Sequence, residues 1–332
     1  MTFFSVLLAL VIEQLRALDP NNPVSALLRR HAASAAPRFA TDPLSTDAGM
    51  GSRRQAGVLA WLSVVLPWTL AVGVVYYLLY RVNIVLAFAW NVAVLYFTLG
   101  FRQFSHYFSD IHLALNNDDV PLARELLKQW TGIETADMPV SEIVRQTLMY
   151  AIISSHRHVF GVFFWFLIPI GPAGAVFYRV AAHLSASWVA PQVEGGRTPG
   201  GFAKRAFFVI DWIPARLTAL GFAIVGNFED AIYAWRNHAG QWPDSNEGTL
   251  LAAGSGALGA RLVGPLAEPS SIETLNETLT ETSQGLDLPV SAAPVGEECS
   301  PRTLQSAVGL VWRAVILWMI LLLLVTVSVW LG

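Results

Sequence analysis

Residues Ala314–Leu331 read AVILWMILLLLVTVSVWL, eighteen residues without a charged side chain. At a helical rise of about 1.5 Å per residue, this stretch is nearly as long as the hydrocarbon core of a bilayer is thick, about 30 Å. A second apolar tract, Ala56–Phe101, contains only one charged residue, Arg81. Helices satisfy their own backbone hydrogen bonds in lipid. The sequence therefore predicts an all-α integral membrane protein.

The composition supports this prediction. The chain is 54% hydrophobic and only 14% charged, whereas a soluble domain carries about 25% charged residues. A net charge of −3 with scattered basic residues argues against clustered nucleic-acid contacts, and we expect no nucleic-acid partner. The single cysteine, Cys299, excludes an intrachain disulfide and a cysteine-based metal site. From the residues alone we expect no metal and no cofactor.

Apolar and polar stretches alternate along the chain and divide it into segments. We predict an N-terminal amphipathic helix and polar connector at 1–55, a transmembrane hairpin at 56–101, cytoplasmic helices at 102–150, broken membrane helices at 151–226, a cytoplasmic loop region at 227–303 and a C-terminal transmembrane helix at 304–332. With spans at 158–176 and 206–226, the total is about five transmembrane helices. The second of these could instead be interfacial or re-entrant. Because no Lys or Arg occurs between Arg261 and Arg302, we expect a disordered acidic loop there.

Basic residues flank the apolar tracts. Arg53, Arg54 and Arg102 border the hairpin, and Arg302 precedes the last helix. Cytoplasmic flanks carry an excess of Lys and Arg. The hairpin loop at Arg81 and the C-terminal end of the last helix should therefore lie outside the cytoplasm.

Motifs of common enzyme chemistry are missing. The chain has no P-loop, no His-Glu-x-x-His and no Gly-x-Ser-x-Gly. The run Ala253–Ala260 has small residues at helical spacing, and close helix packing explains it better than phosphate binding does.

Polar residues near the membrane segments are the candidate site. Asp211 and Arg216 lie within 206–226, where charges are costly and must pair or face a cavity. His156, Arg157 and His158 stand at the mouth of 158–176. They could bind an anion or a metal, but side chains that snorkel to the interface are the favoured interpretation.

Six different short motifs are spread along the chain. They are Asn22-Pro23-Val24, Thr131-Gly132-Ile133-Glu134-Thr135, Gly171-Pro172-Ala173-Gly174 with Tyr178-Arg179, Asp211-Trp212-Ile213-Pro214-Ala215-Arg216-Leu217-Thr218-Ala219, Asn246-Glu247-Gly248 and Gly256-Ala257-Leu258-Gly259-Ala260-Arg261-Leu262. Together and in this order, they resemble the CobD/CbiB cobalamin-biosynthesis proteins. Family enzymes join an aminopropanol-type phosphate to cobyric acid in an amide ligation that depends on ATP and magnesium. The resemblance therefore implies ATP and magnesium as cofactors if that activity is present.

The chain departs from the enzymes at several positions. Arg157 stands in a stretch, Ile153–His158, where they carry a Glu-Asn-x-x-Asp-Gly type sequence. His183–Ala186 replaces a Thr-x-Asp-Ser type sequence, and Asn22 replaces a histidine. The opening residues and Glu229 are similar to AmpE, an inner-membrane relative associated with β-lactamase induction.

These departures lead to a functional prediction. We expect a multi-pass protein of the bacterial inner membrane that is a non-catalytic, AmpE-like accessory or signalling protein. The alternative is adenosylcobinamide-phosphate synthase activity. A transporter is less favoured, because the five spans show no inverted repeat.

A ligand site is predicted where the polar groups could converge. We expect five residues to form it, namely Asn246, Glu247, Arg157, Asp211 and Arg216. Besides the lipid bilayer, the expected partner is a small anionic or corrinoid ligand. Because Arg157 replaces an acid, the site should favour an anion over a magnesium-bound triphosphate. In the alternative arrangement, Asp211 and Arg216 form a private ion pair.

Overall fold

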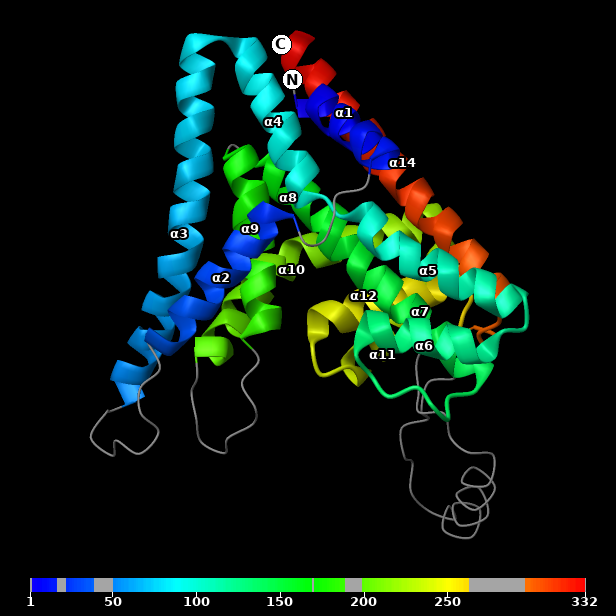
Figure 1. Ribbon diagram of the computed structural model, residues 1–332. Helices are drawn as coiled ribbons and strands as arrows, with labels where there is room; N and C mark the ends of the chain where they lie inside the picture. Colours follow the sequence, from blue (N-terminus) through cyan, green and yellow to red (C-terminus); the bar gives the residue numbers. More distant parts are fainter. Residues whose placement is uncertain are drawn as a thin grey trace, which may run out of the picture. The chain divides into compact units, whose positions relative to one another are not determined.

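The chain folds almost entirely into helices. The computed structural model describes residues 2–16, 22–38, 50–168, 170–188, 199–262 and 296–331, and within these ranges the sole β pairing is a bridge between Ala260 and Glu297. The all-α prediction is confirmed. In chain order (Figure 1) the elements are α1 (Thr2–Leu15), α2 (Pro23–Arg38), α3 (Met50–Val82), α4 (Ile84–Thr98), α5 (Phe101–Asn116), α6 (Val120–Thr131), α7 (Val140–Ser155), η1 (His156–Phe160), α8 (Gly161–Leu167), α9 (Pro172–Ser187), α10 (Pro199–Val225), α11 (Phe228–His238), η2 (Ala239–Gln241), α12 (Ser245–Leu258) and α14 (Pro301–Leu331).

The helices belong to two compact units. Unit 1 comprises Met1–His106, Ser154–Thr218 and Val315–Gly332. Unit 2 comprises Tyr107–Ile153 and Ala219–Ala314. Each unit is therefore built from segments far apart in the sequence.

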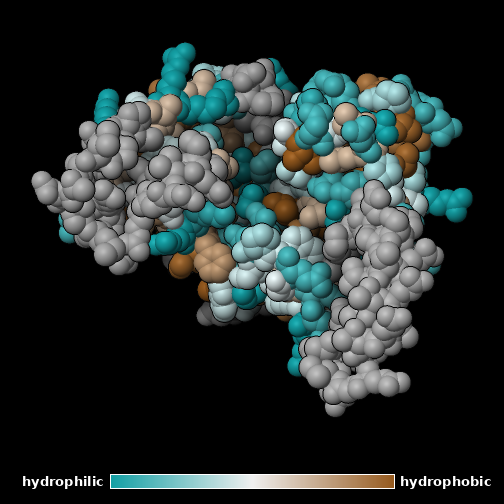
Figure 2. Space-filling view, turned by 90° about the horizontal axis from the view of Figure 1, so that it is seen from below, coloured by the Kyte–Doolittle hydropathy of each residue, from teal (hydrophilic) through white to brown (hydrophobic). Residues whose placement is uncertain are grey.

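Three helices of the described residues are long and apolar enough to cross a membrane, namely Gln55–Val82, Gly200–Val225 and Pro301–Ser328. Thr2–Leu15 and Ile84–Thr98 are shorter apolar helices. Large apolar side chains on α3 and α14 are exposed, among them Leu70 and Leu324, as suits contact with lipid. On the face drawn in Figure 2 hydrophilic residues predominate, and the hydrophobic ones form small patches. Several helices, among them α3 and α14, therefore combine sufficient length with exposed apolar side chains.

In unit 1 the helices α3 and α4 pack side by side as a helical hairpin (Figure 1), and its crossing of the membrane stays a prediction. Asn83 caps α4, because its Oδ1 accepts a hydrogen bond of 2.8 Å from the N–H of Val85. Farther along, Nε1 of Trp90 donates to the carbonyl of Val72 at 3.3 Å and links the two arms. The helix α4 has 15 residues. This corresponds to about 22 Å, which is less than the thickness of a bilayer core.

The predicted span 158–176 is divided between two helices. The helix α8 ends at Leu167, and α9 begins with Pro172 after Gly171, whose φ of 57° suits glycine. The two helices pack closely, since a Cβ on Gly174 would lie 2.1 Å from the carbonyl oxygen of Trp165. The predicted break at this glycine and proline is confirmed; Pro169 lies outside the described residues.

Unit 2 contains a tight pair of helices, α11 and α12. A Cβ on Gly256 would lie 2.2 Å from the carbonyl oxygen of Asp230, and one on Gly254 would lie 2.8 Å from Cδ1 of Ile152. The small residues therefore serve helix packing, as predicted. Both helices lie in the first part of the predicted loop region 227–303, so this part is helical. Asn227 caps α11 and Asp244 caps α12. The predicted acidic loop falls mostly in 263–295, outside the described residues.

Candidate functional site

A buried polar network connects three elements of unit 1. His156 of η1 places Nε2 at 2.8 Å from Oδ1 of Asp211 and Nδ1 at 2.9 Å from Oγ1 of Thr218, both on α10. The hydroxyl of Tyr178 on α9 donates to the same Asp211 oxygen at 2.7 Å. All four side chains are buried. Burying a carboxylate is costly unless it is paired and hydrogen-bonded, and this network meets both conditions.

A π-helical turn brings two residues of this segment to one tyrosine. In η1 the N–H of Gly161 donates to the carbonyl of His156, five residues earlier. In an α-helix, residues five apart point about 140° away from each other, whereas a π turn closes after five residues. As a result, Nε2 of His156 lies 3.5 Å from the hydroxyl of Tyr178, and a Cβ on Gly161 would lie 2.2 Å from Cζ of the same ring.

Three of the predicted site residues lie in unit 1. Asp211 forms its salt bridge with His156, a partner that the sequence reasoning did not assign. The guanidinium of Arg216 stacks at 4.0 Å from the ring of Trp212, and its NH1 donates to the Trp212 carbonyl at 2.9 Å. The guanidinium of Arg157 lies 5.6 Å from the centre of the Phe207 ring. Each of these three charged side chains thus contacts a different neighbour.

The other two predicted residues, Asn246 and Glu247, lie in unit 2 at the start of α12. Their backbone N–H groups donate to Oδ1 of Asp244 at 2.9 and 3.3 Å. The side chain of Asn246 is buried, and that of Glu247 is half-buried. Convergence of these two residues with the three in unit 1 stays a prediction.

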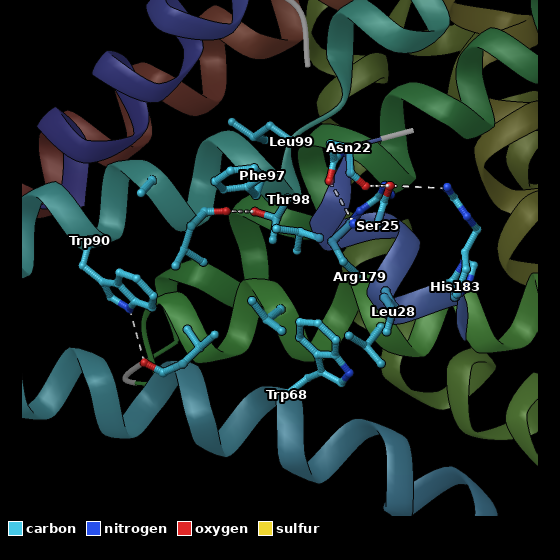
Figure 3. Close-up of a pocket in the computed structure, with 17 residues that line it drawn as sticks. Asn22, Ser25, Leu28, Trp68, Trp90, Phe97, Thr98, Leu99, Arg179 and His183 are labelled. Carbon is cyan, nitrogen blue, oxygen red and sulfur yellow. Dashed lines mark hydrogen bonds between the residues drawn. The ribbon is translucent and has the colours of Figure 1, made fainter. Parts of the chain in front are cut away.

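Unit 1 also contains a pocket of about 610 Å³ between α2, α3, α4 and α9 (Figure 3). Much of its wall is apolar and aromatic, and six of its side chains are Trp68, Val72, Trp90, Phe97, Leu99 and Val176. This volume is within the range of about 300–1,000 Å³ typical of small-molecule sites. The cavity is therefore large enough for a ligand with a substantial apolar part.

Polar and basic residues form one end of the pocket. Oδ1 of Asn22 caps α2 by accepting from the N–H of Ser25 at 2.8 Å, and NH1 of Arg29 donates to the hydroxyl of Ser25 at 3.3 Å. Arg179 donates to the carbonyl of Arg157 at 3.4 Å. In Figure 3 Asn22, Ser25, Arg179 and His183 lie toward one side of the pocket, and Trp90 lies at the other. The pocket thus has two chemically different ends.

Sequence reasoning did not identify this pocket as a site. It had nevertheless singled out several of its residues, since Asn22 and His183 stand where the chain departs from the family enzymes and Arg179 belongs to a shared motif. Arg29 carried no motif signal. What brings these residues together is the packing of both α2 and α9 against α3.

Magnesium and ATP can be tested against these residues. Magnesium prefers carboxylate and phosphate oxygens. Among the described residues of the chain, no group of three or more His, Cys, Asp or Glu could hold a metal ion, and no Asp or Glu is among the described residues that line the pocket. The pocket as described therefore fits an anion better than it fits a magnesium-bound triphosphate.

The fold and these sites define a helical membrane protein with a ligand-sized pocket and a buried His–Asp–Tyr network in unit 1. The family model described as CobD/CbiB protein matches residues 6–283. The chain belongs to this family, and the resemblance noted in the sequence is confirmed.

Individual relatives agree with the family. The cobalamin biosynthesis protein CobD of Stutzerimonas stutzeri is 29% identical over 278 residues, covering 83% of this chain and 84% of the relative. That of Chromobacterium violaceum is 34% identical over 173 residues, 52% of this chain and 55% of the relative. A probable cobalamin biosynthesis protein CobD of Methanothermobacter thermautotrophicus is 25% identical over 221 residues, 65% of this chain and 72% of the relative. No solved structure matches the chain.

These relatives correct the functional prediction. The expectation of a non-catalytic, AmpE-like accessory or signalling protein is wrong, because the matching relatives carry names of cobalamin biosynthesis. A replaced side chain changes local charge, but it does not by itself show that a reaction has been lost.

Proposed function

We propose that this protein is a membrane enzyme of cobalamin biosynthesis with adenosylcobinamide-phosphate synthase activity. It would form an amide bond between the amine of an aminopropanol-type phosphate and a carboxyl group of cobyric acid, with the cleavage of ATP driving the loss of the carboxyl oxygen. The observation that carries the proposal is the family match over residues 6–283, together with the 84% coverage of the Stutzerimonas stutzeri relative. Location in the bacterial inner membrane with several crossings is part of the same proposal, supported by three helices of suitable length.

One enzyme-like motif gives the proposal a residue to test. Asn246-Glu247-Gly248 resembles the family enzymes, and Gly248 is tightly confined, since a Cβ there would lie 2.2 Å from the carbonyl oxygen of Ala239. The motif is therefore held in a fixed place at the first turn of α12. We assign Glu247 a role in substrate binding or catalysis, because it is the one acid of this motif.

The experiment is complementation of a ligase-deficient cobalamin auxotroph. Growth on cobyric acid is expected with the unaltered protein and should be lost or strongly slowed with Glu247→Gln. Glu229→Gln is the matched control, because Glu229 is an exposed acid at the start of α11. Both variants must accumulate in the membrane to the unaltered level. Failure of the unaltered protein to restore growth, or to ligate cobyric acid after purification, would overturn the proposal.

A further inference from the structure

We propose that the pocket of unit 1 binds an anionic lipid, with the lipid phosphate at the basic end and an acyl chain along the aromatic wall. This inference does not depend on ligase activity. It rests on the two-ended chemistry of the pocket and on the helices that build it.

Charge selects the headgroup. Arg29 comes from α2, and Arg179 and His183 come from α9. No described lining residue carries a negative charge, so the basic end favours an anion. A guanidinium matches the oxygens of a phosphate with two parallel hydrogen bonds. Arg179 uses one of its N–H groups for the carbonyl of Arg157, and a guanidinium has five such groups in all.

The polar neighbours hold this end in shape. Two hydrogen bonds join Asn22 and Ser25. The N–H of Ser25 donates to Oδ1 of Asn22 at 2.8 Å, and the Ser25 hydroxyl donates to the Asn22 carbonyl at 2.9 Å. The Ser25 hydroxyl also accepts from Arg29 at 3.3 Å. The first turn of α2 and the arginine one turn later are thus ordered before any ligand arrives, which lowers the entropic cost of binding.

The apolar wall of the pocket determines which kind of group the bound phosphate should carry. The apolar part of the wall includes Trp68 and Val72 of α3 and Trp90 and Phe97 of α4, and in Figure 3 Trp90 lies at the side away from Arg179 and His183. The indole N–H groups of both tryptophans are already bonded, to Nδ1 of His31 and to the carbonyl of Val72. The wall therefore offers mainly ring and methyl surface. A free aminoalkyl phosphate has too few carbon atoms to cover it, whereas an acyl chain gains binding free energy with each CH₂ group that it buries.

The location favours lipid as the source of such a molecule. The residues Trp68 and Val72 belong to Gln55–Val82, a helix long and apolar enough to cross a membrane, and α4 is the shorter apolar helix of the same hairpin. Where such helices cross a membrane, lipid is the most abundant phosphate-bearing amphiphile around them. A soluble phosphate ester would have to leave water to reach the same wall.

The test is a binding measurement on the purified full-length protein in detergent. The probes are phosphatidic acid, phosphatidylcholine of the same chain length, inorganic phosphate and aminopropyl phosphate. We expect phosphatidic acid to bind at least tenfold more tightly than phosphatidylcholine. Neither inorganic phosphate nor aminopropyl phosphate should displace it at equal concentration, because neither can use the apolar wall.

Variants locate the binding. Arg179→Gln and Arg29→Gln should each weaken phosphatidic acid binding at least fivefold, and Arg179→Lys should weaken it less than Arg179→Gln does. Arg205→Gln is the control, since Arg205 is an exposed arginine of unit 1 that does not line the pocket. Because Arg29 is exposed and Arg179 half-buried, the Arg29 variant keeps the test valid if the other one misfolds.

Three outcomes would overturn the proposal. If phosphatidylcholine bound as tightly as phosphatidic acid, the net negative charge of the headgroup would not determine binding. Unchanged phosphatidic acid binding in Arg29→Gln and in every folded Arg179 variant would place the lipid elsewhere. Displacement of phosphatidic acid by aminopropyl phosphate at equal concentration would make the pocket a site for a small phosphate. Ligase activity is measured separately, so the loss of lipid binding and the failure of the proposed function can be distinguished.

Discussion

Nε2 of His156 lies 2.8 Å from Oδ1 of Asp211, and the two residues are only 0% and 3% exposed. This contact joins η1 to α10 across 55 residues of sequence. Removing His156 would leave the buried carboxylate of Asp211 without one of its hydrogen-bond partners, which for a charged group costs about 3 kcal/mol or more. The pair is therefore a point where a small change should have a large effect on stability.

His156→Ala should lower the free energy of unfolding by about 3 kcal/mol or more for this reason. Denaturant or thermal unfolding of the purified protein in detergent measures the loss. His106→Ala is the control, because His106 is exposed on α5, and it should change stability by less than about 0.5 kcal/mol. Equal stability of the two variants would refute the structural importance of the pair.

Gly161→Ala should be strongly destabilising. The added Cβ would lie 2.2 Å from the ring of Tyr178, and overpacking of this kind costs about 1–3 kcal/mol or more. Gly309→Ala is the matched control in α14, where an added Cβ meets nothing within 4 Å. There the change should be neutral or stabilising by about 0.5–1 kcal/mol, since alanine favours a helix. Melting temperatures that fall equally in both variants would contradict this contact.

Cys299 should react slowly with alkylating reagents while the protein is folded. Burial is the main cause that raises the pKa of its thiol to about 11, and the Sγ atom also lies 3.4 Å from the carbonyl oxygen of Arg261. Only the thiolate reacts, so at pH 8 about one molecule in a thousand is reactive. Mass spectrometry after iodoacetamide treatment should show little labelling until denaturant is added. Reactivity should rise about tenfold per pH unit up to about pH 11; a plateau near pH 9 would contradict the raised pKa.

Topology gives a further prediction from the basic flanks. A reporter that is active only outside the cytoplasm should be active when inserted at Arg81 or fused after Gly332, because Arg53, Arg54 and Arg302 favour a cytoplasmic location for the opposite ends of these helices. The same reporter inserted near Arg302 should be inactive. Activity at Arg302 and silence at Arg81 would mean the reverse orientation.

Local sequence was sufficient for the long membrane helices. The apolar tract after Ala314 and the tract around Arg81 predict α14 and the α3–α4 hairpin, because length and hydropathy alone decide whether a helix can cross a membrane. Glycine and proline at 171–172 likewise predict the break before α9. These features depend on neighbours in the chain and need no knowledge of tertiary packing.

The polar connector predicted within 1–55 shows a different outcome. Part of it is helical, since α2 continues to Arg38 and α3 already begins at Met50. Alanine-rich sequence favours helix, and Asn22-Pro23 is a good start signal. The helical part was missed because the Ser, Pro and Asp content of the segment as a whole was read as loop.

The partners of Asp211 could not be predicted. Spacing along one helix pointed to Arg216, five residues away, whereas the salt bridge of the structure is with His156 and a further hydrogen bond comes from Tyr178. They lie on η1 and α9, and only the tertiary fold brings these two elements to the carboxylate on α10. The pocket was missed for the same reason, because Arg29 and Arg179 are 150 residues apart in the sequence.

The π turn at His156–Phe160 makes the number of residues, as well as their identity, a determinant of the fold. The turn allows His156 and Gly161 to face the same tyrosine. Inserting one residue after Val159 would make the turn longer than a π turn closes, and in a helical register it would rotate α8 by about 100° relative to α7. His156 could then keep Asp211, or the glycine could keep its place against Tyr178, but not both. This turn should therefore accept a conservative exchange of a side chain far more readily than an added residue.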